Sequence, residues 1–390
     1  MSTLPATTDV LIVGAGPTGL ALACTLAAEG VSFLLVDRLA EGANTSRAAV
    51  VHARTLEVLD ELEVADRLRA EGQIVPRFTL RDRDRVLATL SFDRLPTRYA
   101  YTLMVPQEIT EGVLLDRLRE LGADVYRPFT LSDVRQDADG VAVAVAADGQ
   151  PPQAVRARYV AGTDGMHSTV RERAGIGFPG DRYEHSFVLA DVRMDWPLRA
   201  DEVMLFVSPE GLVVVAPLPG GRHRIVATVE EAPEHPGAAD VQRLLDTRGP
   251  ATGPVRVREI VWSSRFRVHH RLADRYRAGR ILLAGDAAHV HSPAGGQGMN
   301  TGIQDGVALG HALAAVIGGR ADERQLDSYE RTRRPAAARV VAFTDRMTRM
   351  ATLRTPRSRA ARNALIRLIG RMPPVRRWLA AELAGLRNRQ

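Results

Sequence analysis

The sequence contains no lysine and only one cysteine, and these absences exclude several kinds of protein. With Cys24 alone, neither an intramolecular disulfide nor a metal site built from several cysteines can form. Cys24 lies within the apolar stretch 21–28, which predicts a small buried side chain. All 52 cationic side chains are therefore arginine, a bias typical of a GC-rich genome.

Long apolar runs and a leader-like start are also missing. No stretch approaches the roughly 18 uninterrupted apolar residues of a membrane-spanning helix, and residues 1–9 contain no basic residue, unlike a secretory signal. We therefore expect a soluble, cytoplasmic protein. A composition of 45% hydrophobic and 25% charged residues excludes a largely disordered chain. Because single cores stop growing at roughly 250 to 300 residues, 390 residues predict two packed domains.

Positive charge is concentrated at one end of the chain. The net charge is +6, and residues 346–390 hold 12 arginines and one acid, Glu382, so the other 345 residues carry −5. A negative body argues against nucleic acid as a partner. The tail has one apolar stripe at helical spacing, formed by Val375, Leu379, Leu383 and Leu386. We expect a helix packed on the body, in preference to a membrane-surface or acidic-partner role.

The first forty residues have the pattern of a parallel β-sheet unit. An apolar run over 9–13 stops at Gly14, a helical pattern covers 17–28, and a second apolar run over 31–36 is closed by Asp37. This order predicts strand, helix and strand. Helical spacing recurs over 55–68 and 108–121.

A different hydrophobic pattern interrupts this part of the sequence. Residues 78–92 and 186–229 alternate apolar and polar side chains between turn signals, which predicts an antiparallel sheet. A strand over 281–284, a glycine-rich loop over 285–302 and a helix over 304–316 then resume the first pattern. We expect an α/β fold with one discontinuous domain (1–75, 101–180 and 270–345), an inserted β-sheet domain (76–100 and 181–269) and a basic helical segment (346–390).

The motif Gly14-Ala15-Gly16-Pro17-Thr18-Gly19 follows the first strand and opens the first helix. In a GxGxxG motif the first glycine permits a tight turn, the second lets the backbone approach a pyrophosphate, and the third allows close packing of helix on strand. The helix N-terminus attracts phosphate. Asp37 stands where an acid accepts the hydroxyls of a ribose, so the segment predicts a dinucleotide site.

Two further segments indicate which dinucleotide. The first places Asp164-Gly165 after a short apolar run, and the second places Gly285-Asp286 after a buried strand, followed by Pro293-Ala294-Gly295-Gly296-Gln297-Gly298-Met299-Asn300. Three glycines remove side chains beside a flat ring system. Backbone N–H groups near Met299 and Asn300 would stabilise negative charge on such a ring.

Together these three segments resemble the fingerprints of the single-component flavin-dependent aromatic hydroxylases, the p-hydroxybenzoate hydroxylase-like family, near the branch that acts on polyketides. The match spans about residues 9–345. The resemblance implies a Rossmann-like FAD-binding domain of the glutathione-reductase type. For the ADP half of FAD it implies Gly14, Gly16, Pro17, Thr18, Gly19, Asp37 and Arg38.

The same resemblance assigns the remaining cofactor contacts. It implies Asp164 and Gly165 for FAD and NAD(P)H, Asp286 for the ribityl and pyrophosphate region, and Arg47 and Gln107 as further FAD contacts, with Arg54 as the alternative to Arg47. The flavin ring would lie beside Pro293, Gly295, Gly296, Gly298, Met299 and Asn300. NADPH or NADH would reduce FAD, O2 would give a C4a-hydroperoxyflavin, and one oxygen would pass to an aromatic ring. A single GxGxxG fits a nicotinamide that binds only transiently.

The inserted sheet supplies the candidates for the substrate pocket. These are Met204, Phe206, Val215 and Pro217, with Pro293 from the flavin loop; ordinary sheet core is the alternative interpretation, because a strand alternates its faces. Few charges occur over 203–218, which favours an apolar, polycyclic substrate over a small carboxylate. No residue stands out as a general base.

Several alternatives stay open from the sequence. The WxWxIP signature of flavin halogenases and the GxSxG of serine hydrolases are absent. Paired histidines at 269–270 and at 289 and 291 lack a third ligand, so no metal site is expected. Epoxidation, Baeyer–Villiger oxidation and antibiotic inactivation use the same flavin chemistry. A non-enzymatic flavin protein that docks an acidic carrier protein through its basic tail is the alternative of another class.

Overall fold

The computed structural model describes residues 4–42, 48–147, 149–351, 353 and 355–388. Its first sheet has seven strands, and four neighbouring strands are parallel: β17 (Ile281–Leu283), β10 (Gln153–Gly162), β1 (Thr7–Val13) and β2 (Phe33–Val36), with β2 at the edge. Three antiparallel strands extend it: β16 (Arg277–Ala278) beside β17, and β9 (Val141–Ala146) with β8 (Thr130–Gln136) beside β10. The β8–β9 pair has no counterpart in our sequence prediction.

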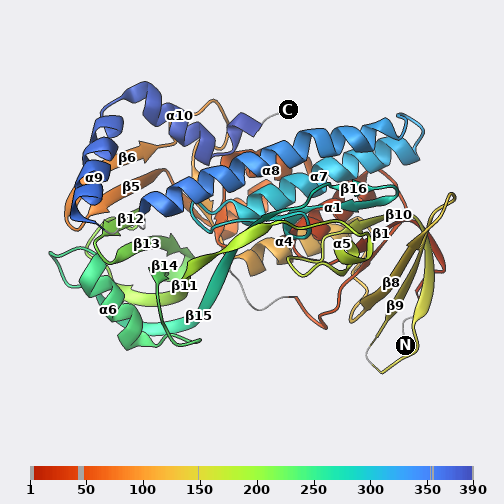
Figure 1. The fold of residues 1–390 in the computed structure, drawn as a ribbon, viewed down its shortest axis with the longest axis horizontal. Helices are drawn as coiled ribbons and strands as arrows, with labels where there is room; N and C mark the ends of the chain where they lie inside the picture. Colours follow the sequence, from red (N-terminus) through yellow and green to blue (C-terminus); the bar gives the residue numbers. More distant parts are fainter. Residues whose placement is uncertain (1–3, 43–47, 148, 352, 354, 389–390) are drawn as a thin grey trace.

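Long helices cover this sheet. They are α1 (Pro17–Ala28), α4 (Gln107–Glu120), α7 (Gly298–Ile317) and α8 (Arg324–Ala351). In Figure 1, α7 and α8 lie side by side along the molecule. A Cβ at Gly302, Gly306 or Gly310 would lie 2.4–2.7 Å from atoms of α1, so these three glycines let α7 pack closely on it. Cys24 of α1 is fully buried, as expected.

Two predicted helices have different bounds in the structure. The helix expected over 55–68 is divided into α2 (Ala53–Glu61) and α3 (Ala65–Glu71), because Glu63 has a positive φ of 59° that an α-helix does not accommodate. The helix expected from residue 304 begins six residues earlier, at Gly298. The short elements of this region are β3 (Val50–Val51), β4 (Gln73–Val75), β7 (Thr102–Met104) and α5 (Thr169–Arg173).

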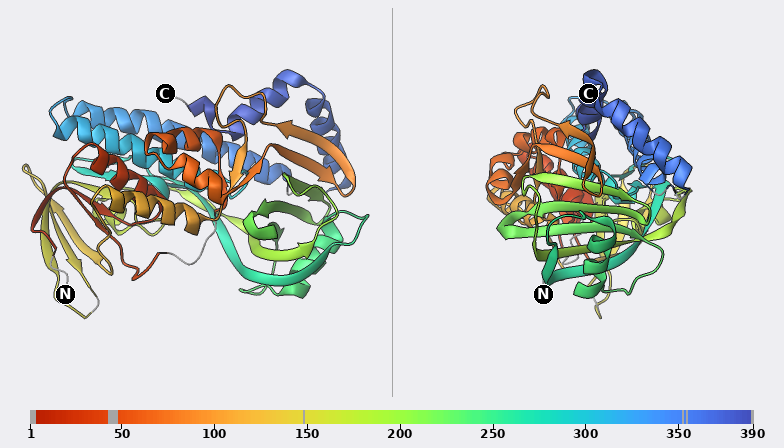
Figure 2. Two further views of the ribbon diagram at one scale, coloured as in Figure 1. Left: turned by 180° about the vertical axis from the view of Figure 1, so that it is seen from behind. Right: turned by 90° about the vertical axis from the view of Figure 1, so that its left-hand side faces the viewer.

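The second large sheet has eight strands in the order β18-β15-β11-β14-β13-β12-β5-β6. Their bounds are β5 (Arg77–Asp82), β6 (Arg85–Ser91), β11 (Gly180–Asp195), β12 (Glu202–Ser208), β13 (Gly211–Leu218), β14 (Arg222–Val229), β15 (Arg256–Leu272) and β18 (His289–Val290). All neighbours are antiparallel except β12 and β5. Figure 1 and Figure 2 place this sheet at the opposite end of the molecule from β8 and β9.

The two faces of the second sheet have different neighbours. One face packs on α6 (Ala238–Arg248), whose Val241 and Leu245 are buried there. On the other face, Val203, Ala216 and Leu218 belong to the hydrophobic cluster that includes the first sheet. We call this second surface the inner face of the sheet.

The basic tail is helical and packs on the body. Its elements are the end of α8, α9 (Pro356–Gly370), α10 (Pro373–Leu383) and a 3₁₀ turn, η3 (Leu386–Asn388). In the predicted stripe Leu383 and Leu386 are buried, and Val375 and Leu379 are half-buried, so the expected packed helix is confirmed. Position 346 falls inside α8, so this segment is continuous with the domain before it.

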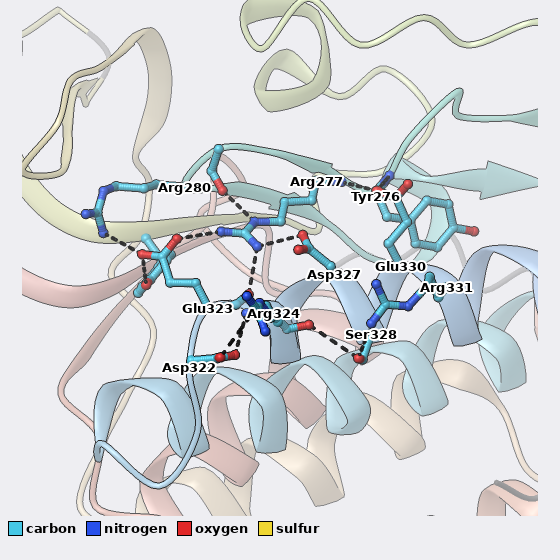
Figure 3. Close-up of polar contacts among 12 residues, drawn as sticks. Tyr276, Arg277, Arg280, Asp322, Glu323, Arg324, Asp327, Ser328, Glu330 and Arg331 are labelled. Carbon is cyan, nitrogen blue, oxygen red and sulfur yellow. Dashed lines mark hydrogen bonds and ion pairs between the residues drawn. The ribbon is translucent and has the colours of Figure 1, made fainter.

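Polar contacts fix α8 to the edge of the first sheet. Arg277 of β16 donates from Nη2 to Glu323 and from Nη1 to Asp327 of α8, at 2.8 and 2.7 Å (Figure 3). Glu330 accepts hydrogen bonds from the backbone N–H groups of Tyr276 and Arg277.

The predicted α/β fold class is confirmed. None of the helices in the described part of the chain combines the length and the apolar character that a membrane span requires.

Candidate cofactor and substrate site

The GxGxxG loop joins the end of β1 to the start of α1, and its three glycines have three different surroundings. Gly14 has a φ of +104°, and a Cβ there would lie 2.5 Å from the carbonyl oxygen of Thr163. A Cβ at Gly19 would lie 1.9 Å from the oxygen of Gly14. At Gly16, no described atom apart from those of Gly16 and its two chain neighbours lies within 4 Å of a Cβ position. The space before the α1 N-terminus is therefore open, as binding of a phosphate at a helix start requires.

Asp37 is fixed beside this loop at the end of β2. Its carboxylate accepts the backbone N–H of Ala15 at 2.6 Å and that of Leu39 at 2.8 Å, and it pairs with Arg127 at 3.5 Å. The next residue, Arg38, is exposed. No local pattern in the sequence indicates Arg127, because it lies ninety residues away from Asp37 along the chain.

The Asp164-Gly165 turn follows β10, and Asp164 is bound to the helix after it. The carboxylate accepts the hydroxyl of Ser168 and the backbone N–H of Val170, and burial raises the pKa of Asp164. Gly165 has a φ of +81°. Arg171, which no motif in the sequence indicates, donates to the carbonyl oxygens of Met166 and Ala287 at 2.9 Å each. The Asp-Gly turn is thereby joined to the turn that carries Asp286.

Asp286 lies in a 3₁₀ turn, η2 (Gly285–Ala287), directly after β17. It is the exposed residue in the otherwise buried segment 281–290. A buried cluster holds this turn from behind, because Asp305 of α7 accepts the backbone N–H of Gly285 at 3.3 Å and bonds His289 Nε2 at 2.6 Å. Arg333 of α8 completes the cluster, donating from Nε to Asp305 at 2.6 Å. His289 therefore has a hydrogen-bonding role in this cluster.

The glycine-rich loop is held against β3 by side chains. Gly295 and Gly296 have positive φ values of 82° and 63°. Asn300 donates from Nδ2 to the carbonyl oxygens of Val50 and Gly296, and its Oδ1 accepts the N–H of His52. His52 Nε2 lies 2.7 Å from the oxygen of Gly295, and burial lowers the His52 pKa to about 4.

The remaining residues of the loop lie close to its ends. Pro293 accepts the N–H of Gly296 at 3.0 Å, Gly298 begins α7, and Met299 is partly buried against the main hydrophobic cluster. At the loop's outer side the tail makes contact, because Gln297 Nε2 donates to the carbonyl oxygen of Leu383 at 2.9 Å. The C-terminal segment therefore contacts the outer side of the glycine-rich loop.

The other predicted cofactor contacts are placed as follows. Arg47 lies outside the described residues. Arg54, the alternative, pairs with Glu57 at 3.2 Å, and its backbone N–H donates to Ala384 of the tail. Gln107 begins α4 and donates from Nε2 to Glu111 at 2.8 Å.

The structure places the predicted pocket residues of the second sheet on the face that packs on α6. Met204, Phe206 and Val215 are buried against α6, and Pro217 shares their face because residues two apart on a strand point the same way. The inner face instead presents the alternate residues. Leu205, Val214 and Val226 are direct neighbours across β12, β13 and β14, and all three are partly exposed.

The described residues fit FAD. Open space at Gly16 before a helix start suits a pyrophosphate, Asp37 is an acceptor beside it, and Asp286 is exposed at the end of a buried strand. These features lie at the carboxyl ends of the parallel strands β1, β2, β10 and β17, where open α/β sheets bind their ligands.

Comparison with known proteins agrees with this geometry. Residues 7–344 match the family described as FAD binding domain, and the chain belongs to it. The chain is 38% identical to the 12-dehydrotetracycline 5-monooxygenase/anhydrotetracycline 6-monooxygenase of Streptomyces rimosus, over 97% of this chain and 76% of that protein. It is 39% identical to a rifampicin monooxygenase of Streptomyces venezuelae, over 85% of this chain and 69% of that protein.

Solved structures give the same result. The crystal structure of a p-nitrophenol 4-monooxygenase from Pseudomonas putida aligns with a TM-score of 0.87 at 27% identity, covering 99% of this chain and 100% of that one. An anhydrotetracycline hydroxylase from Streptomyces rimosus aligns with a TM-score of 0.82 at 37% identity, covering 97% and 76%. This protein is a flavin-dependent aromatic monooxygenase with FAD as its cofactor.

Proposed function

We propose that this protein hydroxylates a polycyclic, polyketide-like aromatic compound, in the chemical class of the tetracycline-type and rifampicin substrates named for its relatives. The observation that supports this substrate class is the apolar, partly exposed row of Leu205, Val214 and Val226 on the inner face of the second sheet. A flat apolar ring system would cover such a row, and a small charged ring would not.

The residues that would hold FAD follow from the same geometry. We assign the ADP half to the Gly14–Gly19 loop and Asp37, the ribityl and pyrophosphate region to Asp286, and the ring to the loop over 293–300. When bound and reduced by NADPH or NADH, FAD supplies activated O2 for transfer of one oxygen atom to the substrate. The chain's part is to orient the substrate and to exclude water from that reaction.

The division into domains stays a proposal. The second sheet is formed by 77–91 and 180–272, with β18 as a short addition from 289–290. We propose that the segments 76–100 and 181–269 form the substrate domain and that 1–75, 101–180 and 270–345 form the FAD domain. A substrate between them would contact both the glycine-rich loop and the inner face.

The test is the visible spectrum of the purified protein, followed by NADPH and NADH consumption in air with a panel of polycyclic phenols. We expect a bound-flavin spectrum, faster consumption with one phenol and a product heavier by one oxygen atom. Product structure then separates a new hydroxyl from an epoxide or a ring-expanded lactone. Tight binding of p-hydroxybenzoate with no binding of larger phenols would contradict the proposed substrate class.

Binding of an acidic carrier protein is a second prediction. The observation that favours it is the surface of α9, where Leu365 and Leu368 are 48% and 60% exposed. Exposed arginines stand at both ends of this helix, Arg357 at its start and Arg371 directly after it. Binding of an acidic carrier protein domain, measured by calorimetry, should be lost in an Arg371→Glu variant. Equal binding by that variant would contradict the prediction.

A further inference from the structure

We propose that Arg224 is the polar anchor of the substrate, donating a hydrogen bond from Nη1 to an uncharged carbonyl oxygen on the ring system. Asp191 is its positioning residue. The inference rests on the proposed function, because it requires the substrate to lie on the inner face of the second sheet. It goes further by naming the group that recognises the substrate and the functional group that is recognised.

The strand register places Arg224 beside the apolar row. Leu205, Val214 and Val226 are neighbours in one row across the sheet, and two residues earlier on β14 stands Arg224. Its neighbours in the adjacent row are Ala216 of β13 and Asp191 of β11. Because residues two apart point to the same face, Arg224 and Val226 both lie on the inner face, opposite α6.

The hydrogen bonds of the guanidinium leave one nitrogen without a partner. Nε and Nη2 of Arg224 donate to the two carboxylate oxygens of Asp191 at 2.6 and 2.7 Å. Nη1 points away from this carboxylate, is buried, and has no hydrogen-bond partner in the described part of the chain. Arg224 is 3% exposed and Asp191 7%. Buried donors of this kind nearly always have a hydrogen-bond acceptor in folded proteins. A ligand that supplies an acceptor to Nη1 therefore explains why the protein provides none.

Three of the other buried side chains with an unpaired nitrogen lie away from this surface. Arg248 belongs to α6, His223 lies on the α6 face of β14, and His289 belongs to the cluster behind Asp286. Arg224 combines an unpaired nitrogen with a place beside a partly exposed apolar row.

The charge of the pair decides which acceptor is favoured. Asp191 neutralises the guanidinium, so the site presents a donor with no net positive charge. A carboxylate would have to lose its hydration without a compensating charge. A ketone or quinone oxygen needs one directed donor, which Nη1 provides. The geometry therefore points to a carbonyl-bearing polycycle.

The experiment is calorimetric titration of the FAD-loaded, oxidised protein with two ligands. These are 1,8-dihydroxyanthraquinone and 1,8-dihydroxyanthracene, which share rings and hydroxyls and differ in two carbonyls. In Arg224→Gln, one amide nitrogen replaces the three guanidinium nitrogens and would face Asp191. We therefore expect about tenfold weaker binding of the quinone, about 1.4 kcal/mol, and unchanged binding of the anthracene. The control is Arg193→Gln, which removes a half-exposed arginine from the same sheet.

Unchanged quinone affinity in Arg224→Gln, or equal weakening of both ligands, would overturn the proposal. If that variant does not fold, the double variant Arg224→Met with Asp191→Leu removes both charges together and carries the same comparison. Asp191→Asn gives the site a net positive charge. This variant should therefore bind anthraquinone-2-carboxylate more tightly than the neutral quinone. A purely structural role of Asp191 would not change this preference. A wild-type protein without flavin or NAD(P)H oxidation would contradict the proposed function itself.

Discussion

At the scale of single residues, two glycines of one loop have separable roles. Gly14 is required by the backbone, since its positive φ and its contact with Thr163 leave no room for a Cβ. Gly16 has an extended conformation and open space, so a side chain there fits the protein and occupies the place of the phosphates.

We predict opposite outcomes for substitutions at these two positions. Gly16→Val should weaken FAD binding at least about tenfold and leave the unfolding free energy of the FAD-free protein unchanged. Gly14→Ala should lower that unfolding free energy by roughly 1–3 kcal/mol. Flavin fluorescence titration and urea unfolding measure the two effects. A Gly16→Val protein that binds FAD normally would disprove the assignment of this loop.

His52 makes stability depend on pH. Its pKa is about 4 in the folded protein, because burial disfavours the charged form, and about 6.5 in an unfolded chain. Between these values the unfolded state binds the additional proton, so stability falls as pH falls. From pH 7 to pH 5 the loss from this group is about 2 kcal/mol.

The measurement compares wild type with His52→Gln, whose amide retains a donor for Gly295. Urea unfolding of the FAD-free proteins at pH 7 and pH 5 should show the additional loss in wild type only. Equal pH dependence in the two proteins would mean that His52 is not held neutral.

At the scale of elements, Asp305 joins α7, β18, α8 and the turn of Asp286. It is fully buried. Burial by itself raises the pKa of Asp305, but the nearby Arg333 and His289 outweigh this effect and lower it. Asp305→Asn would leave the Arg333 guanidinium buried without a counter-charge. We expect a loss of about 3–5 kcal/mol in unfolding free energy, measured by urea unfolding.

The matched control is Asp327→Asn, also an acid paired with an arginine near α8. Asp327 is 51% exposed, and its partner Arg277 retains Glu323 (Figure 3). We expect a loss below about 1 kcal/mol there. Similar losses in the two variants would show that the buried cluster has no special role.

At the scale of the whole molecule, the C-terminal segment returns to the first domain. Leu383 is 4% exposed and packs near Gly295, and the carbonyl oxygens of Leu383 and Ala384 accept hydrogen bonds from Gln297 and Arg54. Through these contacts the C-terminal segment supports the glycine-rich loop.

We predict that Leu383→Ala lowers the unfolding free energy by about 3 kcal/mol and weakens FAD binding. Leu368→Ala, at a residue 60% exposed on α9, should change neither quantity. Thermal unfolding and FAD titration make the comparison. If Leu383→Ala retains full FAD affinity, the tail does not support the loop. Deletion from Arg346 is a poor substitute for these variants, because it would cut α8.

The sequence by itself determined the fold class, the family and the cofactor, because these depend on short local patterns. A GxGxxG between strand and helix, Asp-Gly after β10 and Gly-Asp after β17 are each set by turn geometry and phosphate chemistry within a few residues. The apolar stripe of the tail likewise predicted a packed helix from spacing alone.

The tertiary structure alone decided which face of the second sheet is the inner one. Met204 and Leu205 are equally apolar neighbours, and alternation cannot say which of them packs on α6. Contacts such as Arg224 with Asp191, Arg333 with Asp305, and Gln297 with Leu383 join residues 28 to 86 positions apart. Their pairing depends on strand register and helix packing, which long-range burial fixes only after the whole chain has folded.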